Sequence, residues 1–356
     1  MSESQPKLVH TSEQASEPAR ASVQELPDVA EVHALDGSSS DKEGASSDKN
    51  GQQEGLGAQM LMPQKEQEVV DFLHELSLNP PELPYEPTLI PLLYSVTKAG
   101  SPSSIADVTR VIERSPKLAA KILQVANAAA YRQMEPVTSL HRAVSVLGFK
   151  EVRSIVVLVG AVGAIDKGKV PVAFDGLALL QHQILTGSIA RIFAVAMQDI
   201  SSANRPIVDP EEAYTAGLLH DLGEVLLAMY RPYVWAQVAH EAMQGVDGLY
   251  SAEMGYWPLS HATIGSFLAR LWGLPELLCD MIEWHHTPAN AVTHRREVAL
   301  LAAANILALE GLEPGSPLPL KVAKLLPPDA NLDVIASIVS DYMQSGQFKE
   351  LAHVVY

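Results

Sequence analysis

Cysteine and positive charge are both scarce in this chain of 356 residues. A single cysteine, Cys279, excludes an intramolecular disulfide and fits a reducing compartment. Lys and Arg number 25 against 42 Asp and Glu, which gives a net charge of −17. Such a chain lacks the positive field that attracts nucleic acid or anionic membranes. We therefore expect neither nucleic acid nor a membrane among its partners.

Long apolar runs are missing as well. The longest, residues 155–165, is shorter than the roughly 20 residues that are needed to cross a bilayer. The first ten residues, MSESQPKLVH, lack the basic start and apolar stretch of a secretory signal. These absences indicate a soluble cytoplasmic protein.

Aromatic residues are absent from residues 1–58, which contain the low-complexity run GSSSDKEGASSDKNGQQEG. This segment carries 11 acidic and four basic residues, a large share of the net negative charge. So little apolar surface cannot offset the conformational entropy of the chain. We therefore predict a disordered acidic tail, although a short stretch such as VQELPDVAEVHAL could fold against a partner.

Apolar residues recur at helical spacing from residue 60 onward, and no segment shows the alternation of a strand. Ser115–Pro116 has the form of an N-cap with proline at the first helical position. Proline-rich segments such as NPPELPYEP and EPGSPLPL mark loops. We predict an all-α fold with an N-terminal helical part over 59–165, a second helical half over 166–312 and a C-terminal helical extension over 313–356.

The helix–glycine–helix pattern of residues 139–160 superficially resembles the helix-turn-helix of DNA-binding proteins. A recognition helix must expose polar and basic groups to a groove. Here the second helix, KEVRSIVVLVGAVGAI, is nearly all apolar beyond Ser154. The pattern therefore favours a buried helical hairpin.

Two further packing predictions concern the ends of the helical region. Asn127, in QVANAAAY, lies on an otherwise apolar helix, and we expect it to hydrogen-bond a buried backbone group because an unpaired amide is costly. Near the C-terminus an apolar stripe is formed by Leu332, Ile335, Ile338 and Val339. We expect this stripe to pack within the chain; a homodimer seam is the alternative.

Six of the 12 histidines lie between residues 182 and 286: His182, His220, His240, His261, His285 and His286. His220 and Asp221 are adjacent in AGLLHDLGEVLL. Imidazole and carboxylate are usual ligands of divalent zinc, iron, manganese or nickel. Neighbouring side chains on a helix diverge by about 100°, so both reach one ion only if it lies between them. A single histidine is more often an ordinary residue, but the set as a whole keeps a divalent metal site open.

The segment from Leu83 to about Ala303 resembles the HDOD family, the HD-related output domain of bacterial signalling proteins. The matching blocks are LPYEP, VIERSPKLAAKILQVANAAAY, AVSVLGFKEVRSIVV, AGLLHDLGEVLL and EMGYWPLSHATIGSFLARLWGLPELLCDMIEWHH. The resemblance implies an all-helical fold in which an N-terminal subdomain packs on an HD-like half. It also implies kinship with the metal-dependent phosphohydrolases of the HD superfamily, including the HD-GYP cyclic-dinucleotide phosphodiesterases.

The wider superfamily implies a set of metal-ligand positions in this chain. They match His182, His220, Asp221, His261, His285 and, less closely, His286. The closing aspartate of the pattern is Asn305 here, and an amide oxygen is a neutral, weaker ligand. If the protein is active, the resemblance makes His220 and Asp221 the catalytic candidates.

Two further departures from the HD-GYP pattern concern catalysis. The lysine that follows the His–Asp pair there is Glu224 here, and the GYP signature after His286 is replaced by TPANAVTHRREV. Phosphodiester hydrolysis needs a metal-activated water and positive charge near the transition-state oxygens. We therefore expect a regulatory protein that binds a signalling protein or a small-molecule signal, with little or no catalysis.

Two alternatives remain open at this point. The first is a metal-dependent phosphohydrolase that acts on nucleotides or cyclic nucleotides, in which Asp221 also orients the attacking water. The second is a scaffold whose acidic tail carries the recognition of its partner.

Overall fold

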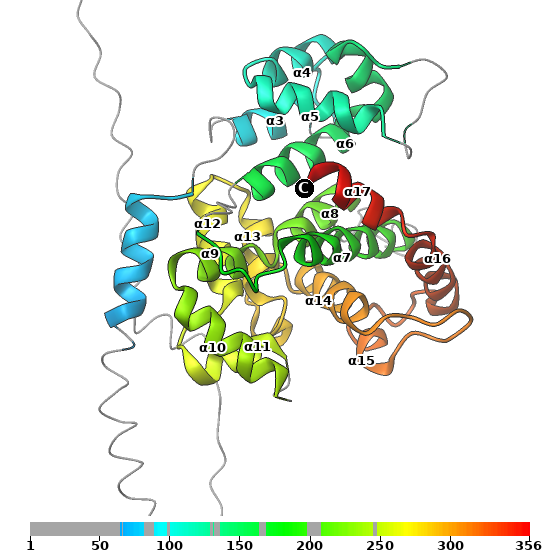
Figure 1. Cartoon of the computed structure of the whole chain (residues 1–356). Coiled ribbons are helices and arrows are strands. Elements are labelled where there is room, and N and C mark those ends of the chain that lie inside the picture. Colours follow the sequence, from blue (N-terminus) through cyan, green and yellow to red (C-terminus); the bar gives the residue numbers. More distant parts are fainter. Residues whose placement is uncertain are drawn as a thin grey trace, which may run out of the picture. The chain divides into compact units, whose positions relative to one another are not determined.

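The computed structural model describes residues 65, 67–81, 89–97, 100–128, 131, 136–163, 169–197, 208–244 and 248–356. These residues form helices and no strand, which confirms the all-α fold (Figure 1). A first helix covers 67–78. It is followed by α3 (Leu89–Thr97), α4 (Ile105–Ile112), α5 (Pro116–Ala126), α6 (Leu140–Gly163), α7 (Gly176–Ala196), α8 (Pro210–Leu219), α9 (Leu222–Tyr230), α10 (Pro232–Met243), α11 (Leu249–Tyr256), α12 (His261–Leu271), α13 (Glu276–Trp284), η2 (Pro288–Asn290), α14 (Arg295–Glu310), α15 (Leu320–Ala323), α16 (Leu332–Ser345) and α17 (Gln347–Val355).

The helices of the N-terminal part begin where their capping residues predict. The Ser104 hydroxyl accepts from the Asp107 backbone N–H, and the Asp107 carboxylate accepts from the Ser104 N–H, which is a complete capping box on α4. Ser115 caps α5 by accepting from the Leu118 N–H, and Pro116 opens that helix as predicted. These caps satisfy backbone donors that the first helical turn leaves unpaired.

Gly148 divides α6 into two helical pieces, since its φ of 78° lies in the left-handed region that favours glycine. The piece after the kink buries ten consecutive residues, 152–161. This burial confirms that the apolar second helix belongs to the core and leaves it no face for a DNA groove.

Asn127 ends α5 and joins it to the chain that enters α6. Its Nδ2 donates to the carbonyls of Leu123 and Val137, both at 2.8 Å, and its Oδ1 accepts from the Val137 N–H at 2.8 Å. The predicted hydrogen bond to a buried backbone group is therefore present, because Val137 is buried. Asn127 itself is exposed, since it stands where the helix ends.

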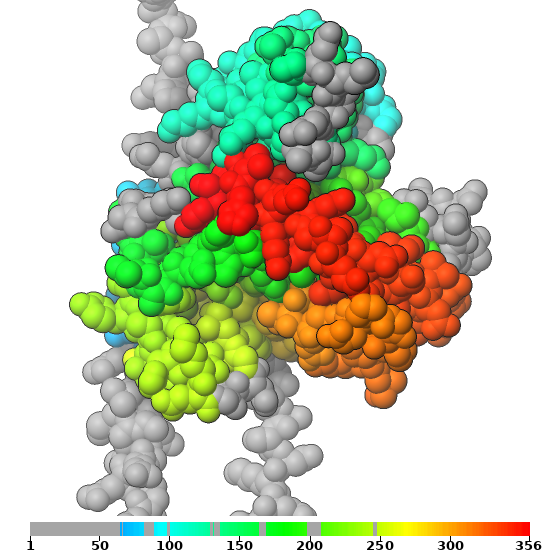
Figure 2. Space-filling model, turned by 45° about the vertical axis from the view of Figure 1, so that its right-hand side comes forward, coloured from blue at the N-terminus to red at the C-terminus, as the bar shows by residue number. Residues whose placement is uncertain are grey.

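The C-terminal stripe packs within the chain, with one exception. Ile335 and Val339 are buried, but Ile338 is 45% exposed and its predicted burial is wrong. The buried face of α16 is narrower than expected and consists of Ile335, Ala336, Val339 and Ser340. Both α16 and α17 pack against α7, and Figure 2 shows the C-terminal residues (red) lying over it (green).

Glycines set the spacing of the two helix pairs that carry the predicted ligands. A Cβ on Gly217 of α8 would lie 2.3 Å from the Cα of Gly187 on α7. A Cβ on Gly223 of α9 would lie 1.9 Å from the carbonyl oxygen of His261 on α12. Neither distance is possible for a side chain, so these backbones touch only because both positions are glycine.

Among the described residues, no helix is both long and apolar enough to cross a membrane. The acidic tail predicted for residues 1–58 lies outside the described residues. The boundaries predicted for the helical parts, at 165 and 312, stay predictions.

Candidate metal centre

The structure brings six sequence-predicted residues together from four places in the fold. His182 lies in the first half of α7, and His220–Asp221 occupies the break between α8 and α9. His261 opens α12, and His285 ends α13 with His286 next to it. The short break after Leu219 turns the chain, so His220 and Asp221 face the same point instead of diverging as neighbours within one helix would.

Asp221 stands at the middle of this group, which we call the His–Asp centre (His182, His220, Asp221, His261, His285 and His286). Its Oδ2 lies 3.0 Å from His220 Nε2 and 3.3 Å from His182 Nε2. Its Oδ1 lies 3.2 Å from His261 Nε2 and 3.6 Å from His285 Nε2. Asp221 with His182 and His220 forms one candidate ligand group, and Asp221 with His261, His285 and His286 forms another. One carboxylate thus serves two sets of imidazoles.

Three of the rings are oriented by a hydrogen bond on the far side from Asp221. Nδ1 of His220 lies 2.9 Å from the Gly217 carbonyl, and Nδ1 of His285 lies 2.7 Å from the Ile282 carbonyl. A carbonyl only accepts, so Nδ1 donates in both rings and Nε2 is the nitrogen that faces Asp221. Such outer partners typically orient metal-ligating histidines in proteins.

The third oriented ring is His261, whose Nδ1 lies 2.7 Å from Glu253 Oε2. The same carboxylate oxygen accepts from the His261 backbone N–H at 2.9 Å. Burial alone would lower the pKa of His261, but the carboxylates of Glu253 and Asp221 outweigh it and hold that pKa well above its usual value. Without a metal, His261 is therefore a cation between two carboxylates.

The centre is closed on one side and open on the other. His220, His261 and His285 are at most 2% exposed and Asp221 is 5% exposed, whereas His182 and His286 are half-buried. Burial lowers the pKa of His285 to about 4, so this ring is neutral at pH 7. Its Nε2 is buried without a hydrogen-bond partner. An unpaired buried lone pair beside a carboxylate fits a metal ligand.

The sequence model of the HDOD domain family matches residues 83–288, more than half of the chain. The chain belongs to the HDOD family.

Relatives of this HDOD protein carry names of different kinds. An "Uncharacterized protein" from Treponema pallidum (strain Nichols) is 24% identical over 220 residues, which are 60% of this chain and 40% of that one. The chain therefore spans less than half the length of that curated relative. A "Putative signal transduction protein" from Marinobacter aquaeolei VT8 is 24% identical with a TM-score of 0.63, over 77% of this chain and 60% of that one. A "Putative phosphohydrolase" from Shewanella amazonensis SB2B is 23% identical with a TM-score of 0.59, over 80% and 98%. At this identity the two structures show the shared fold.

The sequence did not predict two residues that contact the His–Asp centre. Glu253 holds His261, and the Thr186 hydroxyl lies 3.5 Å from His182 Nε2. Thr186 stands one helical turn after His182, so helical spacing could have found it. Glu253 stands on a different helix from His261, and no local pattern links the two.

Asn305, a predicted weaker ligand, and His240, one of the six histidines counted above, take no part in the described contacts of the centre. Asn305 is buried on α14, and its Oδ1 has no hydrogen-bond partner among the described residues. His240 is exposed on α10 and pairs with the Gln244 side chain at 2.7 Å. The ligand role implied for Asn305 stays a prediction.

Glu224 is half-buried on α9, three residues after Asp221, where its charge is unfavourable. Burial, aided by the charge of Asp221, raises the pKa of Glu224 well above its usual value. The unfolded chain ionises this group near its ordinary pKa, whereas the folded chain resists ionisation. Stability is therefore lost as the pH rises through the range between the two values.

Glu224→Gln removes this penalty. We expect the metal-free variant to be more stable than the parent protein at pH 8, where the parent pays for the raised pKa of Glu224. At pH 4 the two proteins should differ little, because Glu224 is then protonated in both states. Urea denaturation in a chelating buffer at the two pH values measures both differences, and an equal gain at pH 4 would contradict the ionisation argument.

Proposed function

We propose that this HDOD protein is a regulatory protein whose His–Asp centre holds a divalent metal and whose output is binding. The observation that carries the proposal is Asp221, whose two oxygens face two different sets of histidines. The centre joins elements from α7 to α13, so an ion held there would tie the HD-like half together. The partner that we propose is a signalling protein or a small-molecule signal.

The donor set decides which ions fit. Five imidazoles and one carboxylate suit zinc, iron, manganese or nickel, with the imidazole share favouring the later metals. His220, Asp221 and His285 would contact the ion from the buried side, and His182 and His286 from the half-buried side. A bound ion would supply Lewis-acid polarisation and a water of lowered pKa. The residues themselves bind and orient the ion and exclude solvent from most of its surface.

Three features oppose efficient phosphodiester hydrolysis. Four of the six residues are at most 5% exposed, so a substrate can approach only past His182 and His286. Glu224 is a carboxyl group where the HD-GYP pattern has a lysine. The charged neighbours that most influence the pKa values of Asp221, Glu224 and His286 are histidines and carboxylates, and no lysine or arginine is among them. Positive charge for a phosphoryl transition state would have to come from the metal alone.

The test begins with protein purified without chelator. We expect elemental analysis to find zinc, iron, manganese or nickel, and chelation to lower the melting temperature reversibly, because a ligand that binds only the folded state stabilises it. The loaded protein should not hydrolyse bis(p-nitrophenyl) phosphate, p-nitrophenyl phosphate or cyclic nucleotides above the rate with free metal.

Two results would overturn parts of the proposal. Metal-dependent turnover that disappears in Asp221→Asn would favour the phosphohydrolase alternative, to which the name of the Shewanella neighbour also points. Absence of stoichiometric binding when each of the four metals is added would remove the metal centre. In that case His261, charged between Glu253 and Asp221, would be an internal ion-pair core.

A further inference from the structure

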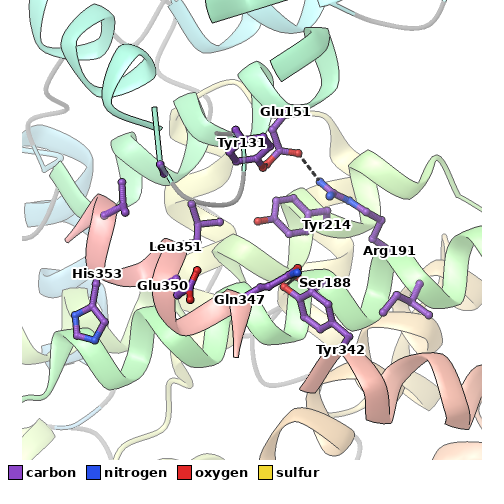
Figure 3. A pocket seen from close by; sticks show the side chains of 13 residues that line it. Tyr131, Glu151, Ser188, Arg191, Tyr214, Tyr342, Gln347, Glu350, Leu351 and His353 are labelled. Carbon is purple, nitrogen blue, oxygen red and sulfur yellow. Dashed lines mark hydrogen bonds and ion pairs between the residues drawn. The ribbon is translucent and has the colours of Figure 1, made fainter. Parts of the chain in front are cut away.

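A cavity of about 500 Å³ lies away from the His–Asp centre (Figure 3). Its lining comes from α6, α7, α8, α16 and α17, with Ala128 and Tyr131 from the segment after α5. None of the six residues of the His–Asp centre lines it. The volume lies within the range of about 300–1,000 Å³ that is typical of small-molecule sites.

Tyrosine rings form much of this cavity. Tyr131, Tyr214 and Tyr342 all line it, together with aliphatic side chains such as Leu351 and Val354. Tyr214 is 3% exposed, and Figure 3 shows its hydroxyl directed into the cavity. Among the described contacts, that hydroxyl has no hydrogen-bond partner. A buried phenol that ends at an open space is a polar anchor for a ligand.

Among the described lining residues one guanidinium occurs, that of Arg191, and it is already paired with carboxylates. Arg191 donates to Glu211 at 2.8 Å and lies 3.5 Å from Glu151, and its guanidinium stacks 3.8 Å from the centre of the Tyr214 ring. Glu151 also accepts from the Tyr131 hydroxyl at 2.7 Å. The charge of Arg191 is therefore already compensated by the carboxylates of Glu151 and Glu211, so it is not available to attract an anionic ligand.

A third carboxylate, Glu350, stands at the rim on the exposed face of α17. No hydrogen bond or ion pair of its side chain occurs among the described contacts. Among the described residues that line the cavity, the carboxylates of Glu151 and Glu350 outnumber the guanidinium of Arg191, so the lining carries a net negative charge. Its field attracts cations and repels anions such as phosphates.

We propose that this cavity binds a small organic cation, an ammonium group with an apolar body. The electron-rich faces of the tyrosines and the carboxylates attract the charge, as in aromatic sites for ammonium ligands. The Tyr214 hydroxyl accepts from the ammonium, Glu350 lies across the mouth, and Leu351 and Val354 cover the apolar body. This inference does not rest on metal binding at the His–Asp centre.

The test compares three molecules that share a phenyl-ethyl body and differ in charge: phenethylammonium, 2-phenylethanol and 3-phenylpropionate. Isothermal titration calorimetry on the full chain at low salt should show the cation binding at least tenfold tighter than the alcohol, and the carboxylate weakest. The same order is expected with and without added metal, so failure here and failure of the metal centre are separate results.

Variants locate the site. Glu350→Gln should weaken the cation about two- to fivefold, the range of an exposed ion pair, and leave the alcohol unchanged. Tyr214→Phe should weaken the cation about tenfold or more, the value of a hydrogen bond to a charged group. Glu313→Gln is the matched control, because Glu313 is exposed and absent from the lining. Circular dichroism and melting temperatures confirm that each variant folds.

Several outcomes would overturn the proposal. Binding of the alcohol or the carboxylate as tight as the cation would remove the charge argument. Equal effects of Glu350→Gln and Glu313→Gln would place any binding elsewhere. Lack of cation binding at about 10 mM, a concentration at which even a Kd of 1 mM gives saturation, would show that the cavity is not a site for this class.

Discussion

Gly223→Ala is expected to destabilise the protein by more than about 3 kcal/mol, beyond the usual cost of an overpacked core. The new methyl group would start 1.9 Å from the His261 carbonyl oxygen and 2.9 Å from the Gly265 nitrogen. Both are backbone atoms, so no rotamer change can relieve the overlap, and α9 and α12 must separate. Urea denaturation followed by circular dichroism measures the loss.

Gly255→Ala is the control for this change. Gly255 lies within α11, and a Cβ there would meet no atom within 4 Å. Alanine in a helix interior is about 0.5–1 kcal/mol more favourable than glycine, so this variant should equal or exceed the parent in stability. Equal stability of the two variants would show that α9 and α12 do not touch as described.

Asp221→Asn is expected to lower metal affinity by more than about 100-fold, the upper end of the loss seen for outer partners of a metal ligand. Burial would raise the pKa of Asp221, but His220, His182 and His261 hold it well below its usual value, so the carboxylate is charged at neutral pH. The substitution removes that charge and replaces one oxygen by a donor. Competition with a chromophoric chelator measures the affinity.

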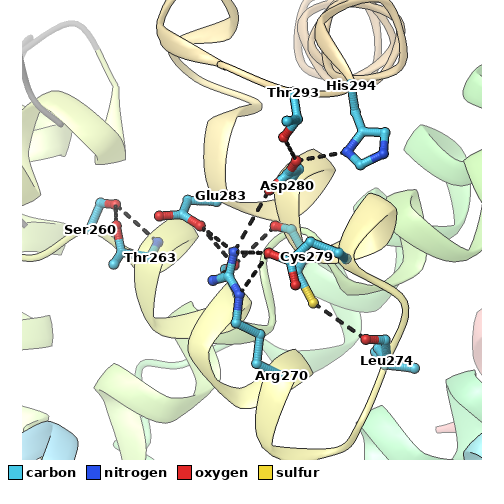
Figure 4. A network of polar contacts seen from close by, with 11 residues as sticks. Ser260, Thr263, Arg270, Leu274, Cys279, Asp280, Glu283, Thr293 and His294 are labelled. Atoms are coloured by element: carbon cyan, nitrogen blue, oxygen red, sulfur yellow. Dashed lines mark hydrogen bonds and ion pairs between the residues drawn. The ribbon is translucent and has the colours of Figure 1, made fainter. Parts of the chain in front are cut away.

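Asp280→Asn is the control that distinguishes a specific loss of metal affinity in Asp221→Asn from a general loss of stability. Asp280 is also buried, but it lies in a different polar network, where it accepts from the Thr293 hydroxyl and His294 and lies 3.7 Å from Arg270 (Figure 4). We expect this variant to lose about 1–3 kcal/mol of stability, the cost of unsatisfied buried groups, with unchanged metal affinity. If both variants lost metal equally, general loosening of the HD-like half would explain the result.

The fold was largely predictable because its signals are local. Ser115–Pro116 predicts the start of a helix, and Gly148 predicts a break. The apolar spacing of α12 and α13 predicts a buried face, and each of these signals depends only on residues that are neighbours in sequence. The predicted burial of Ile338 on α16 was wrong, because the helices that pack against α16 decide which of its apolar residues are buried, and the sequence of α16 does not show where they lie.

The candidate site was predictable in composition, not in arrangement. The resemblance to HDOD proteins supplied His182, His220, Asp221, His261, His285 and His286, and the structure gathers all six. Glu253 and the tyrosine-lined cavity were not found, because each depends on helices that meet only in the folded chain. Arg191 shows the difficulty well, since its partners Glu151 and Glu211 lie 40 and 20 residues away.

The contact between Gly223 and His261 has a consequence for whether this chain can hold a metal. A ligand set can stay complete in sequence while one added methyl group moves two helices apart and removes the common point that the histidines face. Counting histidines and aspartates in the sequence therefore does not by itself decide whether the folded chain can hold an ion. The residue two positions after the aspartate, which contacts no ion itself, sets an equally strict requirement.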